Sequence, residues 1–183
     1  MKRLLIIFFL IPLFLIPATE FSIERAKRID GYLKRISARK TESVILKNIT
    51  FSQRDLNSYL NLIYTRKYAR EVKYIKLELG KNNYIGGNMK IVLKGEKYAK
   101  IPSFLKDFEI DFEGKVFCSN YRMRYDFEKV RINGTSFSPE ILDEAFGAAQ
   151  TGYKIKKSMF DWFRLLPGIK NIKTDHKKLI IFY

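Results

Sequence analysis

The stretch FEIDFEGKVFCSNYRMRYDF, residues 108–127, decides the fold because its side chains alternate between apolar and polar. Residues 108–113 place an apolar side chain at every second position, and residues 121–127 repeat this pattern beyond a polar turn. A period of two puts alternate side chains on opposite sides of a strand. The stretch therefore predicts two antiparallel strands with one apolar face and one polar face.

Two earlier segments extend this pattern. Residues 75–79 and 89–93 also alternate, and the Asn and Gly residues between them predict a turn. The apolar phase slips between Phe127 and Val130, which predicts a bulge or an end of strand pairing near Glu128-Lys129. Four consecutive segments of this kind predict an antiparallel meander.

Helical patterns flank the meander on both sides. Residues 24–40 have apolar side chains at helical spacing in a charged background, which predicts an amphipathic helix. Ser52 is a favourable N-cap for a helix from Gln53 to about Arg66, whose apolar stripe is Leu56, Leu60 and Ile63. We expect this stripe to pack on the sheet.

The C-terminal third predicts two more helices and a closing strand. Ser138 and Pro139 suit the start of a helix that continues to about residue 149, and residues 155–166 have a second helical pattern. The last residues, KLIIFY, read as a strand. Helices before and after a run of strands predict an α+β fold, with a curved antiparallel meander packed against amphipathic helices.

The N-terminal run favours an export signal over the alternative of a buried core helix, because it has no polar face. Lys2 and Arg3 precede an uncharged run of 13 residues, 4–16, that contains Pro12. This run suits a secretory signal peptide better than a membrane span, which needs about 20 apolar residues. We expect residues 1–18 to be a cleaved signal peptide or a retained membrane anchor, residues 19–48 a connecting amphipathic helix, and residues 49–183 one α+β domain. The predicted location is the periplasm or the outer face of the cytoplasmic membrane.

The strongly basic composition predicts an anionic partner. Lys and Arg total 35 against 19 Asp and Glu, a net charge of +16. In residues 121–127 the rings and the arginines alternate, so they should lie on opposite faces and could not grip one nucleic acid strand together. Together with export, this favours an anionic membrane surface, with no nucleic acid partner.

The residues for catalysis or metal binding are scarce. His176 is the only histidine and Cys118 the only cysteine, so the chain lacks the usual side chains of a zinc site. Glu109, Asp111 and Glu113 line one strand face. They could form the paired carboxylates of a hydrolase or a face of salt bridges with Lys and Arg, and we favour the second interpretation. We expect no enzyme activity and no cofactor.

A resemblance to a known family follows from the order of these segments. A hydrophobic N-terminus, the capped helix in FSQRDLNSYL, a meander, NGTSFSPEIL and a closing strand together resemble small bacterial envelope proteins with tubular lipid-binding-like architecture. The resemblance implies an apolar groove that binds lipid or a lipid-linked polymer. On this basis the candidate groove residues are Ile75, Leu77, Leu79, Ile91, Leu93, Phe108, Ile110 and Phe112. Their alternative role is ordinary core packing.

The sequence thus predicts an exported, non-enzymatic envelope protein that binds lipid or an anionic envelope polymer. The alternative is an assembly module that docks on a membrane or on an acidic partner without any ligand groove.

Overall fold

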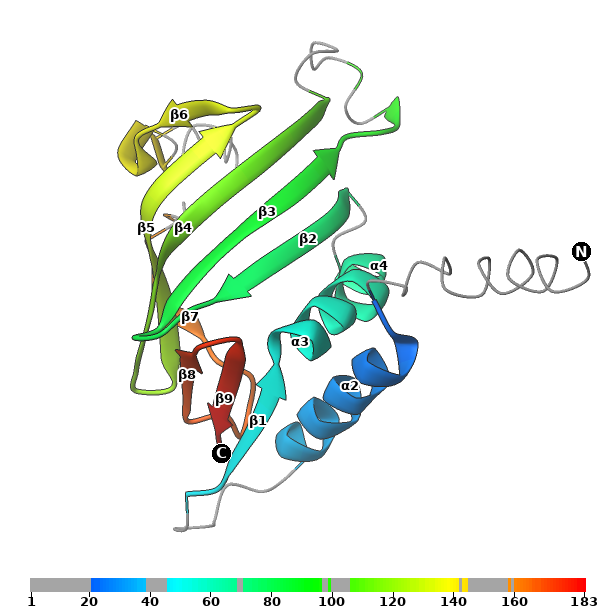
Figure 1. Cartoon of the computed structure of the whole chain (residues 1–183), viewed down its shortest axis with the longest axis vertical. Helices are drawn as coiled ribbons and strands as arrows, with labels where there is room; N and C mark the ends of the chain where they lie inside the picture. Colours follow the sequence, from blue (N-terminus) through cyan, green and yellow to red (C-terminus); the bar gives the residue numbers. More distant parts are fainter. Residues whose placement is uncertain are drawn as a thin grey trace, which may run out of the picture.

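In the part of the chain that the structure describes, two antiparallel sheets lie beside helix α2 and the continuous helical segment from α3 to α4 (Figure 1), and residues 139–141 and 143–144 are also helical. The computed structural model describes residues 21–38, 46–68, 71–96, 106–141 and 160–183, together with 99, 143–144 and 158. The helices are α2 (Ile23–Ser37), α3 (Gln53–Tyr59), the π-helix η2 (Leu60–Tyr64) and α4 (Thr65–Tyr68). The strands are β1 (Asn48–Ser52), β2 (Val72–Leu79), β3 (Tyr84–Val92), β4 (Asp107–Ser119), β5 (Arg122–Ile132), β6 (Thr135–Phe137), β7 (Phe163–Arg164), β8 (Asn171–Asp175) and β9 (Lys178–Phe182).

The large sheet is the predicted meander. Its strands follow the order β2-β3-β4-β5-β6, all antiparallel, and β7 pairs with the start of β5. The register of β4 on β5 shifts after Glu113, where Glu128 is the extra residue, so the predicted bulge is confirmed. A side chain at Gly114 would place its Cβ 2.1 Å from the carbonyl oxygen of Asp126. The two backbones therefore approach most closely at the bulge, where only glycine fits.

The small sheet joins distant parts of the chain. Its order is β1-β9-β8, so the first strand of the described chain pairs with the last. The strand predicted from KLIIFY is confirmed as β9. Thr174 of β8 ties this sheet to the large one, because its hydroxyl donates to the carbonyl oxygens of Gly80 and Tyr84 at 3.1 and 3.0 Å.

The closed hydrophobic core lies at the junction of α2, the small sheet and one end of the large sheet. Ile29 and Ile36 of α2 are each 2% exposed and pack in one cluster with Phe51 and Leu179 of the small sheet. Leu79, at the end of β2, belongs to the same cluster. Helix α2, predicted as a connector, thus contributes two of the most buried side chains of the core.

Helix α3 lies beside the edge strand β2 (Figure 1). A row of amide side chains attaches α3 and η2 to this edge. Asn57 accepts from Leu77 N at 2.8 Å and donates to Leu77 O at 3.0 Å. Asn61 makes the same pair of bonds with Ile75, at 3.0 and 2.6 Å, and Gln53 accepts from Leu79 N at 2.8 Å. An amide group carries both a donor and an acceptor, so each asparagine replaces a peptide group of a neighbouring strand. We call these three residues the amide ladder.

The amide ladder changes how the predicted helix 53–66 meets the sheet. The helical segment extends to Tyr68 with a π-turn inside it, close to the predicted bounds. The sequence predicted that its apolar stripe would pack on the sheet. The large sheet instead meets the polar side of the helix, and Leu56 packs against the closed core.

The predicted N-cap of α3 is confirmed as a capping box. The Ser52 hydroxyl accepts from the backbone N–H of Asp55, whose carboxylate accepts from Ser52 N at 2.9 Å. The same carboxylate lies 2.6 Å from the Arg28 guanidinium of α2. Burial by itself raises the pKa of Asp55, but the bonds from Ser52 and the charge of Arg28 outweigh it and lower the pKa below 3.8.

Two local predictions differ from the structure. Residues 155–166 were predicted as a helix, but Phe163 and Arg164 form strand β7, because Met123 and Arg122 of β5 offer a free strand edge for them to pair with. Gly86 and Gly87 were placed in a turn but lie inside β3, and the turn is made by Asn82 and Asn83 at positive φ. The predicted N-cap at Ser138 is confirmed, because its hydroxyl accepts a hydrogen bond from Ile141 N at 3.3 Å. The predicted leader 1–18 and the apolar positions 145–159 lie outside the described residues.

Candidate functional site

An apolar cavity of about 690 Å³ lies along one face of the large sheet. This volume is within the range of about 300–1,000 Å³ that is typical of ligand sites. Strands β2 to β5 and β7 supply the lining: Ile75, Ile85, Met89, Ile91, Ile110, Phe112, Val116, Met123, Tyr125, Phe127, Val130, Ile132 and Phe163. We call this space the apolar cavity.

The strand registers explain why every lining side chain faces one way. Ile75 is paired with Met89, Met89 with Ile110, and Ile110 with Ile132. Directly paired residues in antiparallel strands project to the same side of the sheet. The bulge at Glu128 restores this phase, so that Phe127 and Val130 both face the cavity although they are three residues apart.

The lining contains a single hydroxyl, and it is already bonded. Tyr125 donates to the carbonyl oxygen of Ile85 at 2.6 Å, and burial raises the pKa of its phenol. Phe112 and Phe127 stand edge-on to the Tyr125 ring, at centroid distances of 6.0 and 4.6 Å. The surface of the cavity therefore has no unsatisfied polar side chain to offer a polar ligand.

The eight candidate groove residues divide between this cavity and other positions. Ile75, Ile91, Ile110 and Phe112 line the cavity. Leu79 belongs to the closed core instead, and Leu77 occupies the space above Gly87, where a side chain would clash. Phe108 is paired with Ile91 but does not line the cavity, and Leu93 lies just beyond the end of β3.

The candidate set missed the whole contribution of β5. Met123, Tyr125 and Phe127 continue the alternation that predicted the strand, so the same signal extended to them. Val116 and Val130 also line the cavity and were not among the candidates. Each lies beyond an interruption of the alternating pattern, Val116 after Gly114 and Val130 after the bulge. Phe163 could not be predicted as a lining residue, because the pattern of residues 155–166 predicts a helix.

The carboxylates on the opposite face are held in salt bridges. Lys129 Nζ lies 3.2 Å from Glu113, and Arg131 Nε lies 3.7 Å from Asp111. Asp111 also accepts from the side-chain amide of Asn88 at 2.6 Å. The structure therefore arranges these groups as the salt-bridged face that we favoured over a pair of catalytic carboxylates.

Glu109, the third carboxylate of this row, accepts a hydrogen bond from the hydroxyl of Tyr74. This bond, together with the negative charges of Glu109 and Asp111, raises the pKa of Tyr74 to about 12. The phenol of Tyr74 therefore keeps its proton near neutral pH, and its hydrogen bond to Glu109 links β2 to β4.

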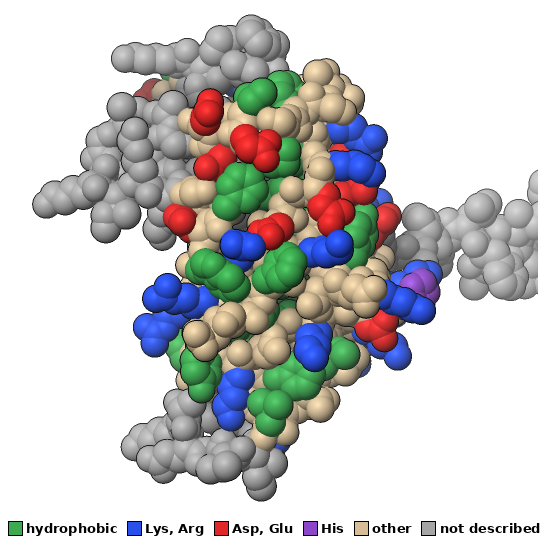
Figure 2. All heavy atoms as spheres, turned by 90° about the vertical axis from the view of Figure 1, so that its left-hand side faces the viewer, with side chains coloured by type: hydrophobic (Ala, Val, Ile, Leu, Met, Phe, Trp, Pro, Cys, Tyr) green, Lys and Arg blue, Asp and Glu red, His purple; other side chains and the backbone are tan. Residues whose placement is uncertain are grey.

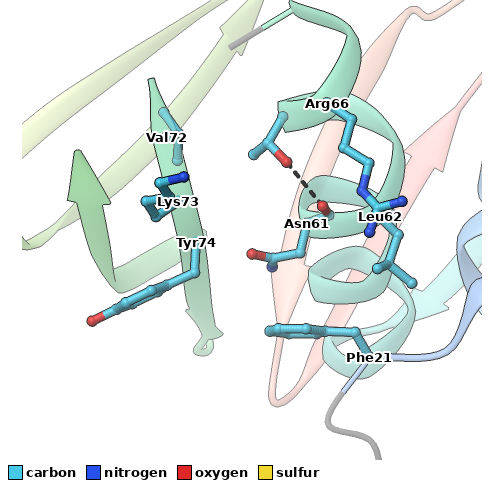
Figure 3. Close-up of a pocket in the computed structure, with 8 residues that line it drawn as sticks. Phe21, Asn61, Leu62, Arg66, Val72, Lys73 and Tyr74 are labelled. Carbon is cyan, nitrogen blue, oxygen red and sulfur yellow. Dashed lines mark hydrogen bonds between the residues drawn. The ribbon is translucent and has the colours of Figure 1, made fainter. Parts of the chain in front are cut away.

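A second hollow, of about 430 Å³, opens where the amide ladder ends (Figure 3). The next helical position at ladder spacing is Thr65, whose hydroxyl donates to Asn61 O at 2.9 Å and not to the strand. Figure 3 shows the Phe21 ring directed toward β2, while the ring of Tyr74 points away from the helix. Arg66 and Lys73 make this hollow basic, in contrast to the apolar cavity.

The single histidine and the single cysteine occupy ordinary positions. His176 lies in the exposed turn between β8 and β9, next to Asp175. Cys118 is half-buried, and burial raises the pKa of its thiol. Within the described ranges, no group of three His, Cys, Asp or Glu side chains could hold a metal ion.

Comparison of the chain with protein-family models, curated proteins and solved structures finds no match. Among the helices that the structure describes, none has the length and apolar character needed to cross a bilayer.

Proposed function

We propose that this chain is an exported envelope protein that binds a lipid, or the acyl part of a lipid-linked polymer, in the apolar cavity and catalyses no reaction. The observation that supports this proposal most directly is that the cavity extends beyond the closed core, which it adjoins at Ile85 and Met123. Residues such as Ile75, Ile110 and Phe112 are only half-buried, whereas Ile29, Phe51 and Ile181 are at most 3% exposed. An apolar surface of this size outside the core suits an apolar ligand.

The basic residues fit the second part of the proposal. The chain carries a net charge of +16, and a Lys or Arg near an anionic membrane contributes about 1 kcal/mol to binding. The salt-bridged face supports a binding role over hydrolysis, because Asp111 and Glu113 each have a cationic partner.

Native mass spectrometry of the protein purified from cells that express the full chain tests lipid binding. We expect a bound mass that organic solvent extracts as lipid. Ile110→Trp should obstruct the middle of the cavity and lower the amount of this bound mass, because Ile110 lies in the middle of the lining strands. Ile29→Val is the matched control: it weakens the closed core by about 0.5–1.5 kcal/mol but leaves the cavity unchanged.

Two results would contradict the proposal. Wild-type protein free of lipid in repeated preparations would favour the alternative of an assembly module without a ligand. An equal lipid content in Ile110→Trp and wild type would place the ligand outside the cavity.

Cell fractionation tests export separately. We expect the full chain outside the cytosol or with the cytoplasmic membrane. Recovery of the chain with ribosomes or DNA would overturn the envelope assignment, whatever the cavity binds.

A further inference from the structure

Strand β4 turns into β5 in the lower part of Figure 1. Exposed aromatic side chains and arginines gather at this end of the hairpin. Tyr121 is 54% exposed, Phe117 43% and Trp162 39%, which is unusual for rings of this size. Figure 2 shows Lys and Arg side chains between hydrophobic ones in the lower half of the molecule, while most acidic side chains on that face lie in the upper half. We define the hairpin-end surface as the residues Phe117, Tyr121, Arg122, Arg124, Trp162 and Arg164.

Two arginines in this surface face each other directly across paired strands. Arg122 of β5 is the register partner of Arg164 of β7, and both are exposed. Like charges in directly opposite positions destabilise a sheet unless an anion lies between them. Neither arginine forms a salt bridge with another described residue. The pair is therefore suited to bind an anionic group from outside the chain.

A hollow of about 330 Å³ lies beside this pair, and the residues around it are Arg122, Asp161, Trp162, Phe163 and Arg164. The carboxylate of Asp161 accepts from Ser158 N at 2.9 Å, so part of its charge is directed to the backbone. The two arginines outnumber this one carboxylate, and the hollow is basic.

Phe163 connects the hollow to the apolar cavity. It is paired with Met123 of β5 and lines both spaces, whereas Arg164 on its C-terminal side projects to the other face. Because Phe163 lines both spaces, a charged group held in the hollow by Arg122 and Arg164 would lie beside one end of the apolar cavity, not on the cavity face itself. This arrangement matches a phospholipid, which joins a phosphate to an acyl chain.

We infer that the hairpin-end surface docks on a membrane that contains anionic phospholipids, with a headgroup phosphate between Arg122 and Arg164 and the Phe163 end of the apolar cavity toward the bilayer. This inference rests on the proposed function, since it names the surface from which the cavity would take its lipid. Exposed aromatic side chains suit the interfacial region of a membrane, and arginines suit its phosphates.

A single-stranded nucleic acid is the competing partner for rings and cations on one face. The prediction that the rings and arginines of residues 121–127 lie on opposite faces holds for Tyr125 and Phe127, which line the cavity. Two rings outside that stretch, Phe117 and Trp162, lie near Arg124. The Arg124 guanidinium lies 5.7 Å from the Phe117 ring and 5.2 Å from the Trp162 ring. The Arg124 guanidinium is also fixed by the Asp126 carboxylate, with Nε 2.6 Å from Oδ1. It therefore stays beside the two rings, in the place that a stacked base would need.

Vesicle co-sedimentation of the full chain tests this inference. We expect binding to phosphatidylcholine vesicles that contain phosphatidylglycerol, weaker binding to phosphatidylcholine alone, and weaker binding in high salt. Arg122→Gln and Arg164→Gln should each lower the affinity about fivefold, and the double variant about 30-fold. Arg54→Gln removes the same charge from an exposed position on α3 and should have no effect. Residues 1–20 are identical in all variants, so any contribution from them cancels.

Several outcomes would overturn the inference. Equal binding of the double variant and Arg54→Gln would show that the hairpin-end surface is not the docking site. Binding to a single-stranded oligonucleotide that exceeds vesicle binding and depends on the same arginines would assign the surface to nucleic acid. Native mass spectrometry separates this inference from the proposed function: loss of docking with lipid still in the cavity counts against the surface alone, and docking without any cavity lipid counts against the proposed function.

Discussion

Asp55 shows how one buried carboxylate can fix both a helix start and a contact between helices. Its side chain is 5% exposed, closes the capping box with Ser52 and pairs with Arg28 of α2. The capping part was visible in the sequence, because Ser52 and Asp55 are three residues apart. The pairing with Arg28 was not, because a contact between residues 27 positions apart leaves no local pattern.

We expect Asp55→Asn to lower the free energy of unfolding at pH 7 by about 1–2 kcal/mol. The pKa of Asp55 is lower in the folded chain than its ordinary value of 3.8, so the charged form stabilises the fold above that pH. This contribution is lost as the pH falls below 3.8, and the curves of wild type and variant should converge there. Urea unfolding from pH 2.5 to 7 measures the effect.

Asp30→Asn is the control for this change. It removes a carboxylate from an i,i+4 salt bridge with Lys34 on the surface of α2, which contributes about 0.3–0.5 kcal/mol. A loss at Asp55 no larger than the loss at Asp30 would contradict the role assigned to the buried carboxylate.

The carboxylate row gives a second prediction for single residues. Asp111→Asn should change stability by less than about 1 kcal/mol, because Arg131 is a distant and half-exposed partner. It should also leave lipid binding unchanged, since Asp111 lies on the face opposite the cavity. Native mass spectrometry and urea unfolding check both points, and an activity that this substitution abolishes would restore the hydrolase hypothesis.

At the level of helices and strands, the amide ladder replaces a neighbouring strand at the edge of β2. Alternating N–H and C=O groups of Ile75, Leu77 and Leu79 would otherwise be exposed for pairing with another chain. The sequence did not predict this arrangement, because Gln53, Asn57 and Asn61 have the spacing of a solvated helix face. Polar side chains at helical spacing do not show whether water or a strand edge satisfies them.

Asn57→Ala should lower the free energy of unfolding by about 1–3 kcal/mol, because it leaves both backbone groups of Leu77 without their partner. Arg54→Ala on the same helix is exposed, and its effect should be within about 0.5 kcal/mol of zero. Urea unfolding compares the two. Equal stability of the two variants would show that water replaces the amide at no cost.

At the level of the whole molecule, the chain has a closed core and, adjoining it, an apolar cavity along one face of the large sheet. The period-two pattern predicted which side chains share a face, and the registers confirm this from β2 to β5. It could not predict which part of that face would be closed. Leu79 and Ile75 have the same place in the pattern, yet the first lies in the core and the second lines the cavity. That difference depends on where α2 and the small sheet pack, which involves contacts between distant segments.

Leu79→Ala and Ile110→Ala should therefore differ in cost. Leu79 lies in the core cluster, so its truncation should cost about 2–5 kcal/mol and lower protection in both sheets. Ile110 borders an existing cavity, and its truncation should cost about 1 kcal/mol or less in lipid-free protein, because few packing contacts are lost. Hydrogen exchange and urea unfolding measure both. Equal losses would mean that the cavity is part of the core.

The spacing of the amide ladder also limits how the chain length can change. Four helical residues advance about 6.0 Å and two strand residues about 6.6 Å, so helix and strand stay in step for only a few contacts. Inserting one residue between Asn57 and Asn61 would rotate Asn61 about 100° away from Ile75. In any related chain, the helix and β2 must therefore gain or lose residues together, four in the helix for every two in the strand.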